Sequence, residues 1–197
     1  MTIFRFRLGS QSRFTYATVS HGLCAAALIS CGLPAHSQAD ASRRLPSIGA
    51  DGGIYLPSSA KTRSLYGSQW TSIGLGLGSI GAPSQQGDTG LDLQVLYSKH
   101  GDNSALIIPV GLEYSKGLGS PNQSVTPYVA VGADVVPNSI KSVPDHIDNK
   151  WRFAGGATAA IGLNFGNSAY AEARYRAVSH VQGIDLSGTA FTVGVRF

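Results

Sequence analysis

The sequence predicts an all-β protein: an eight-stranded antiparallel up-and-down β-barrel that crosses a membrane. Only 13% of its 197 residues are charged, about half the usual share for a soluble domain. Glycine is common, at 25 residues. From residue 47 onward, eight short segments alternate large apolar residues with small or polar ones, which is the period of a strand with two different faces. No apolar run reaches 18 residues, so membrane-spanning helices are not expected.

The net charge of +4 comes mainly from the first 39 residues. They contain three arginines and no acid, whereas residues 40–197 contain twelve basic and eleven acidic residues, a net charge of +1. We therefore expect no nucleic-acid partner, because the folded part lacks a basic excess.

Residues 1–39 have the pattern of a secretory signal peptide, since the arginines precede an apolar core at residues 22–33. Small residues at positions 37 and 39 predict cleavage before Asp40. Residues 40–46 would then form a short periplasmic tail and residues 47–197 the outer-membrane barrel. Both cysteines lie in the apolar core, and lipoprotein processing at Cys31 is the alternative to cleavage before Asp40.

The first four strand segments are residues 48–56, 72–78, 91–98 and 106–115. The first alternates weakly, with isoleucine, alanine and leucine against glycine, aspartate and tyrosine. The second sets isoleucine and leucine against glycine and serine. In the third, leucine, valine and tyrosine alternate with mainly polar residues. The fourth opposes five apolar positions to proline, glycine, glutamate and serine. Each therefore has one face suited to an apolar environment.

The last four segments are residues 128–135, 150–166, 171–177 and 190–197. The fifth and sixth place valine, alanine and aromatic residues opposite a face rich in glycine. The seventh opposes alanine and one tyrosine to a glutamate and two arginines. The eighth is the clearest, with phenylalanine and valine on one face and alanine, threonine, glycine and arginine on the other.

The composition of the second face decides which side of the barrel is apolar. A soluble barrel directs its apolar face inward and its charged face to water. Here the second face is mostly glycine, alanine, serine and threonine, with isolated charges. Small residues suit the narrow interior of an eight-stranded barrel, and the continuous apolar face suits lipid. The sequence therefore predicts a membrane barrel with its apolar face outside.

Nine charged residues should point into the lumen by this alternation. They are Asp51, Asp92, Glu113, Asp134, Arg152, Glu172, Arg174, Arg176 and Arg196. Unpaired charges in a confined interior are costly, so we expect these five acids and four bases to pair. A network that plugs the barrel is the favoured interpretation, and a very narrow gated pore is the alternative. The glycines of the first two segments would make room for long arginines or leave a cavity for a small apolar ligand.

Loop lengths predict which end of the barrel faces outward. The connections at one end are residues 57–69, 99–104, 137–149 and 179–188, whereas those at the other end are residues 80–88, 118–124 and 166–168. Longer loops outside and shorter turns inside are typical of outer-membrane barrels. The first long loop contains Lys61 and Arg63 and can form one helical turn. We expect either a contact with anionic lipopolysaccharide or a solvated loop there.

With these features the chain resembles small outer-membrane β-barrel proteins of the OmpA, OmpX and OmpW-like class. The resemblance covers residues 47–197 and includes a last strand, 189–197, that ends in phenylalanine. It implies the bacterial outer membrane, contacts with outer-membrane lipid and lipopolysaccharide, and Phe197 as an assembly signal for the barrel-assembly machinery. We expect a monomer.

No pattern in the chain indicates catalysis. No zinc, calcium, nucleotide or nucleophile-elbow motif is present, so we expect no cofactor and no enzyme. After His180 the sequence continues Val181-Gln182-Gly183, without the serine and asparagine that follow the histidine in outer-membrane lipid A deacylases. The predicted role is structural or surface-interacting. A porin-like narrow channel for small or apolar solutes is the alternative, followed by a lipid-modifying enzyme.

Overall fold

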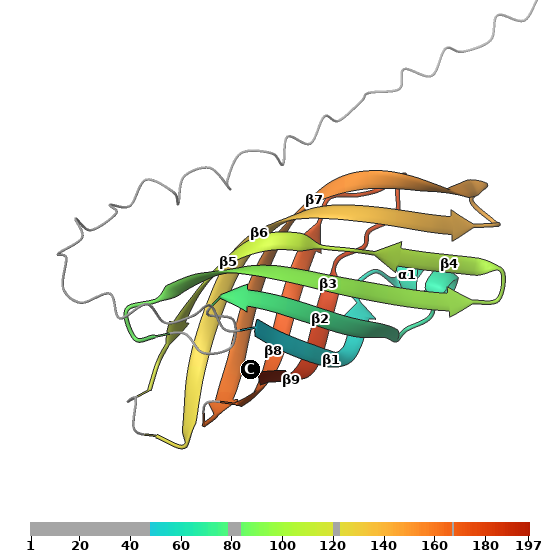
Figure 1. Cartoon of the computed structure of the whole chain (residues 1–197). Helices are drawn as coiled ribbons and strands as arrows, with labels where there is room; N and C mark the ends of the chain where they lie inside the picture. Colours follow the sequence, from blue (N-terminus) through green and yellow to red (C-terminus); the bar gives the residue numbers. More distant parts are fainter. Residues whose placement is uncertain (1–47, 79–83, 120–122, 167) are drawn as a thin grey trace, which may run out of the picture. The chain divides into compact units, whose positions relative to one another are not determined.

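The computed structural model describes residues 48–78, 84–119, 123–166 and 168–197. The signal peptide predicted at residues 1–39, the tail at residues 40–46 and both candidate processing sites lie outside the described residues. Figure 1 shows the order of the elements. They are β1 Ile48–Pro57, α1 Ala60–Tyr66, β2 Trp70–Gly78, β3 Asp88–His100, β4 Asn103–Ile107, β5 Val110–Gly117, β6 Val125–Ser142, β7 Ile147–Phe165, β8 Ala169–Val178 and β9 Gly188–Arg196.

The strands form one antiparallel sheet that closes on itself. The first strand, β1, pairs with both β2 and β9, with Gly49 opposite Arg196 at one end and Pro57 opposite Gly188 at the other. Both β4 and β5 pair with β3 and β6, so they are two halves of one strand. Pro109 lies between these halves and has no backbone N–H to donate, which interrupts the ladder. The closed sheet therefore has eight strands, and the predicted all-β barrel is confirmed.

The prediction that the apolar face lies on the outside of the barrel is also confirmed. Large apolar side chains on the outer face are exposed, including Leu112 at 63%, Ile161 at 65% and Val193 at 68%. On the inner face, Leu96 and Arg176 are almost fully buried. An exposed apolar surface that surrounds a barrel marks a lipid-facing belt. No helix among the described residues has the length and hydropathy needed to span a bilayer.

The connection predicted at residues 137–149 is not a loop. Strand β6 continues to Ser142 and β7 begins at Ile147, which leaves only a tight turn in which His146 has a φ of 53°. The inner face of this extension contains fully buried Val136 and Ile140. The strands continue because that inner face has a partner to pack against. In Figure 1, the β3–β4 and β6–β7 hairpins extend beyond the other strands at the end that carries α1.

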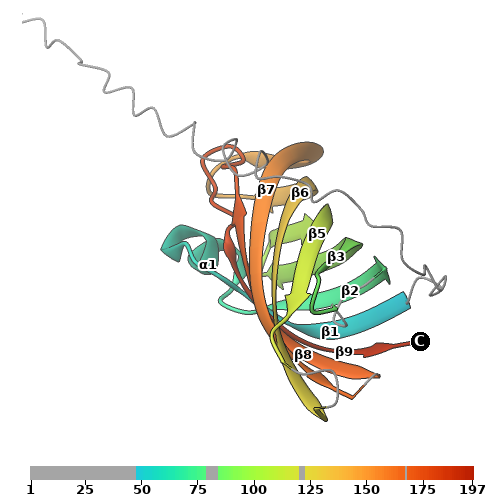
Figure 2. The same ribbon diagram turned by 90° about the vertical axis from the view of Figure 1, so that its left-hand side faces the viewer.

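The helix α1 forms in the first long connection, where one helical turn was predicted. The Oγ of Ser59 accepts a hydrogen bond from the N–H of Thr62 at 3.4 Å, and Gly67 ends the helix with a φ of 88°. Its side chains Leu65 and Tyr66 are buried, so the expectation of a solvated loop is wrong. Figures 1 and 2 show α1 at the end of the barrel opposite the C-terminus. We call the end that carries α1 the loop end, and the end that carries the C-terminus the terminal end.

Candidate functional site

Arg174 lies at the centre of the lumen and contacts three carboxylates. Its Nη1 pairs with Asp92, its Nη2 lies 2.6 Å from Oε2 of Glu113, and its Nε lies 2.7 Å from Oε1 of Glu172. Asp92 and Glu113 come from β3 and β5, so their contacts cross the barrel, whereas Glu172 lies on β8 beside Arg174. Each of the four side chains is at most 4% exposed. Water is therefore excluded from the pairs, and the geometry of the guanidinium fixes their positions.

Arg176, two residues further along β8, extends the same network. Its Nε lies 2.7 Å from Oδ2 of Asp134 on β6, and its Nη1 donates to Oε1 of Gln94 at 2.7 Å. Its Nη2 also lies 3.4 Å from Oδ2 of Asp92, so the two arginines share one carboxylate. We call this set the arginine network. It consists of Asp92, Glu113, Asp134, Glu172, Arg174 and Arg176.

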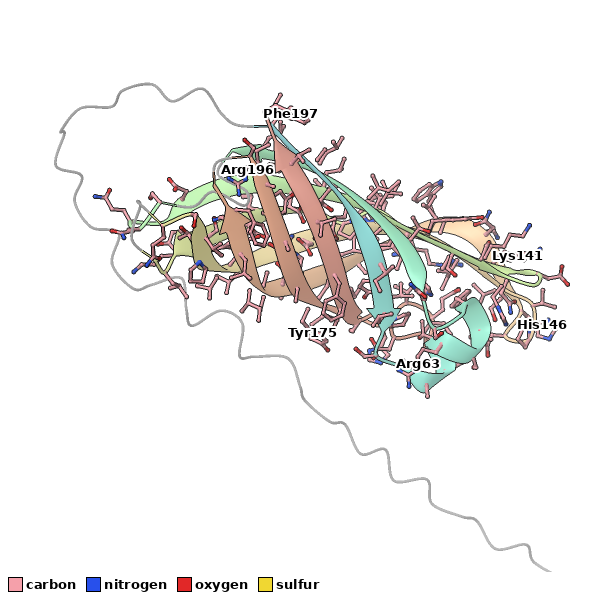
Figure 3. All side chains as sticks on the ribbon, turned by 90° about the horizontal axis from the view of Figure 1, so that it is seen from below. Arg63, Lys141, His146, Tyr175, Arg196 and Phe197 are labelled. Carbon is pink, nitrogen blue, oxygen red and sulfur yellow. The ribbon has the colours of Figure 1, made fainter. Side chains whose placement is uncertain are left out.

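Two other predicted lumen residues, Asp51 and Arg196, both contact Tyr170. Asp51 accepts a hydrogen bond from the hydroxyl of Tyr170 at 3.0 Å. Arg196 donates to Asn164, and its guanidinium lies 5.3 Å from the centroid of the Tyr170 ring. Figure 3 shows Arg196 near Phe197 at the terminal end. These contacts form a second polar level in the lumen below the arginine network.

Arg152 corrects the sequence prediction. It was expected to face the lumen, but it lies on the loop-end extension of β7, where its Nη1 donates to the carbonyl of Lys150 at 3.3 Å. The alternation of faces continues there, but the strand has left the closed part of the barrel. The predicted near balance of charge changes accordingly, from five acids and four bases to five acids and three bases in the lumen.

Glycines make room for tyrosines and carboxylates rather than for arginines. Tyr128 on β6 is paired with Gly162 on β7, and a Cβ at Gly162 would lie 2.3 Å from the Tyr128 ring. A Cβ at Gly194 would lie 2.4 Å from the Tyr170 ring. On β2, a Cβ at Gly74 would meet Asp51 at 2.4 Å. A large side chain thus lies over a glycine on the adjacent strand, which lets a narrow lumen hold many polar groups.

The loop end of the lumen is filled by apolar side chains, a feature that the sequence analysis missed. Trp70 lies 5.6 Å from the Tyr55 ring and 6.1 Å from the Tyr66 ring, measured between centroids. We call the surrounding cluster the outer core. It consists of Tyr55, Leu65, Tyr66, Trp70, Leu96, Ala105, Ile107, Val136, Ile140, Ile147, Ala154, Val178, Val181, Ile184, Leu186 and Ala190. Nearly all of these residues are less than 9% exposed.

Hydrogen bonds and one ion pair hold α1 over the outer core. The hydroxyl of Thr62 donates to the carbonyl of Asp185 at 2.5 Å, and the amide of Asn103 donates to the carbonyl of Leu65 at 3.1 Å. Lys61 pairs with Asp145 at 3.1 Å. Burial, with a contribution from the charge of Asp145, raises the pKa of Tyr66 to about 12. The helix is therefore a fixed part of the barrel end.

Three histidines of the described residues lie exposed at the loop end: His100 is the last residue of β3, and His146 and His180 lie in connections. Among the residues that the structure describes, no group of three or more histidine, cysteine, aspartate or glutamate side chains is placed to hold a metal ion.

The chain is similar to several solved structures. Neisserial surface protein A matches with a TM-score of 0.58 and 16% identity over 77% of this chain and 95% of its own. The N-terminal β-barrel domain of Pseudomonas aeruginosa OprF gives 0.48 and 16%, with coverage of 78% and 98%. The outer membrane enzyme PagL gives 0.45 and 12%, with coverage of 77% and 98%. No family model and no curated protein matches the chain.

The chain therefore has the fold of a small outer-membrane β-barrel. Together with the exposed apolar belt, this fold assigns it to a bacterial outer membrane.

Proposed function

We propose that this protein is a closed, non-enzymatic barrel whose role is structural or lies in interactions at the cell surface. The observation that carries the proposal is that the lumen is filled at successive levels. The arginine network spans it with ion pairs between β3, β5, β6 and β8. The outer core then fills the loop end beneath α1. An eight-stranded barrel has little interior to spare, so side chains at both levels leave no continuous path for solutes.

The protruding sheet supports a role at the surface. Trp151 and Phe153 on β7 are 57% and 76% exposed, and they lie on the part of β7 that extends beyond the end of β8. Next to the end of β8, the carbonyl of Gly155 on β7 accepts a hydrogen bond from the N–H of Ser179 at 2.9 Å. Beyond it, the described residues provide no strand partner for this edge. An exposed strand edge beside aromatic side chains is a surface on which a partner strand can bind.

We propose that the terminal end faces the periplasm and the loop end with α1 faces outward, because the shorter turns of outer-membrane barrels are periplasmic. The proposed partners follow from these two ends of the barrel. Phe197 is 82% exposed at the terminal end, where the barrel-assembly machinery can reach it. Lipopolysaccharide surrounds the loop-end half of the belt in an outer membrane. We propose that the protein works as a monomer and needs no cofactor.

Conductance in planar lipid bilayers tests the closed lumen. We expect no stepwise conductance from the refolded protein, because the arginine network and the outer core block the path. The variant Arg176→Ala, which removes the contacts of Arg176 with Asp92, Gln94 and Asp134, should give at most brief leak events. Steady channels in the unmodified protein would overturn the proposal in favour of the narrow channel.

Labelling of intact cells tests the orientation. A membrane-impermeant amine reagent should modify Lys141, which Figure 3 shows at the loop end, and should spare Lys116 at the terminal end. Disruption of the outer membrane should make Lys116 reactive and serves as the control. Labelling of Lys116 but not Lys141 on intact cells would reverse the assignment of the two ends.

A further inference from the structure

The lipid-facing belt is uneven around the barrel. Across β2, β3 and β5 most cross-strand rows on the outer face consist of large side chains, for example Leu77 beside Leu91 beside Leu112. Across β7, β8 and β9 the middle residue is alanine at positions 171 and 173, before Tyr175 follows on the same face. Ala173 lies between Ile161 and Phe191 on the neighbouring strands.

This difference produces a groove on the outer wall of the barrel. Its floor is Ala171 and Ala173, its walls are Ile161 and Leu163 on one side and Phe191 and Val193 on the other, and its volume is about 630 Å³. A second depression over β8, β9 and β1 shares Ala171 and Val193 with it. Ligand pockets in proteins have similar volumes, about 300–1,000 Å³. An unfilled apolar groove would lose contacts along its whole lining, so it needs an apolar occupant.

One positively charged side chain, that of Lys116, lies at the terminal end of this surface. Lys116 on β5 is exposed and pairs across the sheet with Val129, which lines the groove. Val129 is followed in the same cross-strand row by Ile161 and then Ala173. Among the described strand residues at the terminal end, Lys116 is the one charged residue on the lipid-facing side. It lies one residue before the end of β5, where the belt meets the headgroup region of the periplasmic leaflet.

We propose that this groove binds one acyl chain of an anionic phospholipid from the periplasmic leaflet, with the lipid phosphate beside Lys116. The acyl chain would lie over Ala171 and Ala173, between the two walls, and the glycerol and phosphate would extend past Val129 towards Lys116. The groove supplies the apolar walls, and the lysine supplies the positive charge that a phosphate group seeks. A zwitterionic lipid offers the same chain but less net charge for Lys116.

Native mass spectrometry of the refolded protein tests this site. The protein is extracted from vesicles of phosphatidylglycerol or of phosphatidylcholine, and retained lipid is counted. We expect phosphatidylglycerol to be retained in preference to phosphatidylcholine. Ala173→Leu fills the floor and should lower retention by about tenfold, equivalent to about 1.4 kcal/mol. Ala177→Leu, on the same strand and face but outside the groove, is the matched control and should retain lipid normally.

Lys116→Gln tests the headgroup contact separately. It should lower the retention of phosphatidylglycerol by roughly fivefold and leave that of phosphatidylcholine unchanged. Lys99→Gln, at the loop end of β3, should change neither. Equal retention by Ala173→Leu and Ala177→Leu would overturn the proposal. So would a dimer mass that Ala173→Leu abolishes, because the occupant would then be a second copy of the chain.

Discussion

Two levels of the barrel interior can be compared directly, the arginine network and the outer core. The arginine network joins four strands through two guanidiniums and four carboxylates, all at most 4% exposed. The outer core joins strands, α1 and the connection after β8 through apolar and aromatic side chains. The first is held by directional charge pairs and the second by packing. Both close the same lumen.

This difference in the interactions determines how the stability of each level should respond to substitution. Removal of one partner from a buried ion-pair network leaves the remaining groups charged and without solvent. This costs far more free energy than the loss of part of an apolar contact. The network also contains more acids than bases, so it depends on its arginines more than on any single carboxylate. The outer core should instead lose stability in proportion to the volume removed. The predictions below run from the largest expected effect to the smallest.

Substitution of the central arginine should be the most damaging change. Arg174→Met leaves Asp92, Glu113 and Glu172 together without their shared cation, so we expect a loss of at least about 3–5 kcal/mol and poor refolding. Urea unfolding in lipid vesicles measures the loss. Glu113→Gln should cost much less, and Arg152→Met, on the exposed extension of β7, should be neutral. A Glu113 variant as damaging as the Arg174 variant would contradict the view that acids are in excess.

A smaller and more local effect is expected in the outer core. Leu65→Ala removes a buried side chain from α1 and should cost about 2–3 kcal/mol, because the helix can settle only partly into the space. Hydrogen exchange should rise over residues 60–66, while the strands around Arg174 stay protected. Ser64→Ala, at an exposed position on the same helix, is the control. Loss of protection throughout the barrel would show that the two levels are not separable.

Two glycines on β7 test the packing of tyrosine over glycine. Gly162→Ala places a Cβ 2.3 Å from the Tyr128 ring, so the ring must move and we expect a cost of roughly 1–3 kcal/mol. Gly155→Ala meets nothing within 4 Å and should be nearly neutral. Thermal unfolding of both variants gives the comparison. Equal costs would mean that general strand propensity, and not the ring, requires glycine at position 162.

The smallest effect is a pH dependence confined to the outer core. Because the pKa of Tyr66 is raised to about 12 from an ordinary value of 10, its contribution to stability is complete below pH 10 and is lost as the pH rises towards 12. The fluorescence of Trp70, whose ring lies against Tyr66, should report this step in a Trp151→Phe background. The step should disappear in Tyr66→Phe. A step that persists in that variant would have to come from another tyrosine.

The alternation of residue types determined much of this protein without any knowledge of its structure. It placed the apolar side chains on the outer wall and gave the number of strands, because side chains in a strand must point to opposite faces in turn. It also identified Arg174, Arg176 and the carboxylates around them as inward-facing. A period of two holds along each strand whatever lies opposite, so local sequence is sufficient for these conclusions.

Only the tertiary structure decided which inward residues meet and how the loop end is closed. The pairing of Arg174 with Asp92 joins residues 82 positions apart, and strand alternation says nothing about which level of the barrel each residue occupies. For the same reason the sequence analysis placed Arg152 in the lumen. The part of β7 that contains Arg152 extends beyond the closed barrel. The outer core draws on α1 and on Val181, Ile184 and Leu186, which have no repeating pattern. Their burial depends on the extended β6–β7 hairpin that covers them, and only the assembled fold brings these segments together.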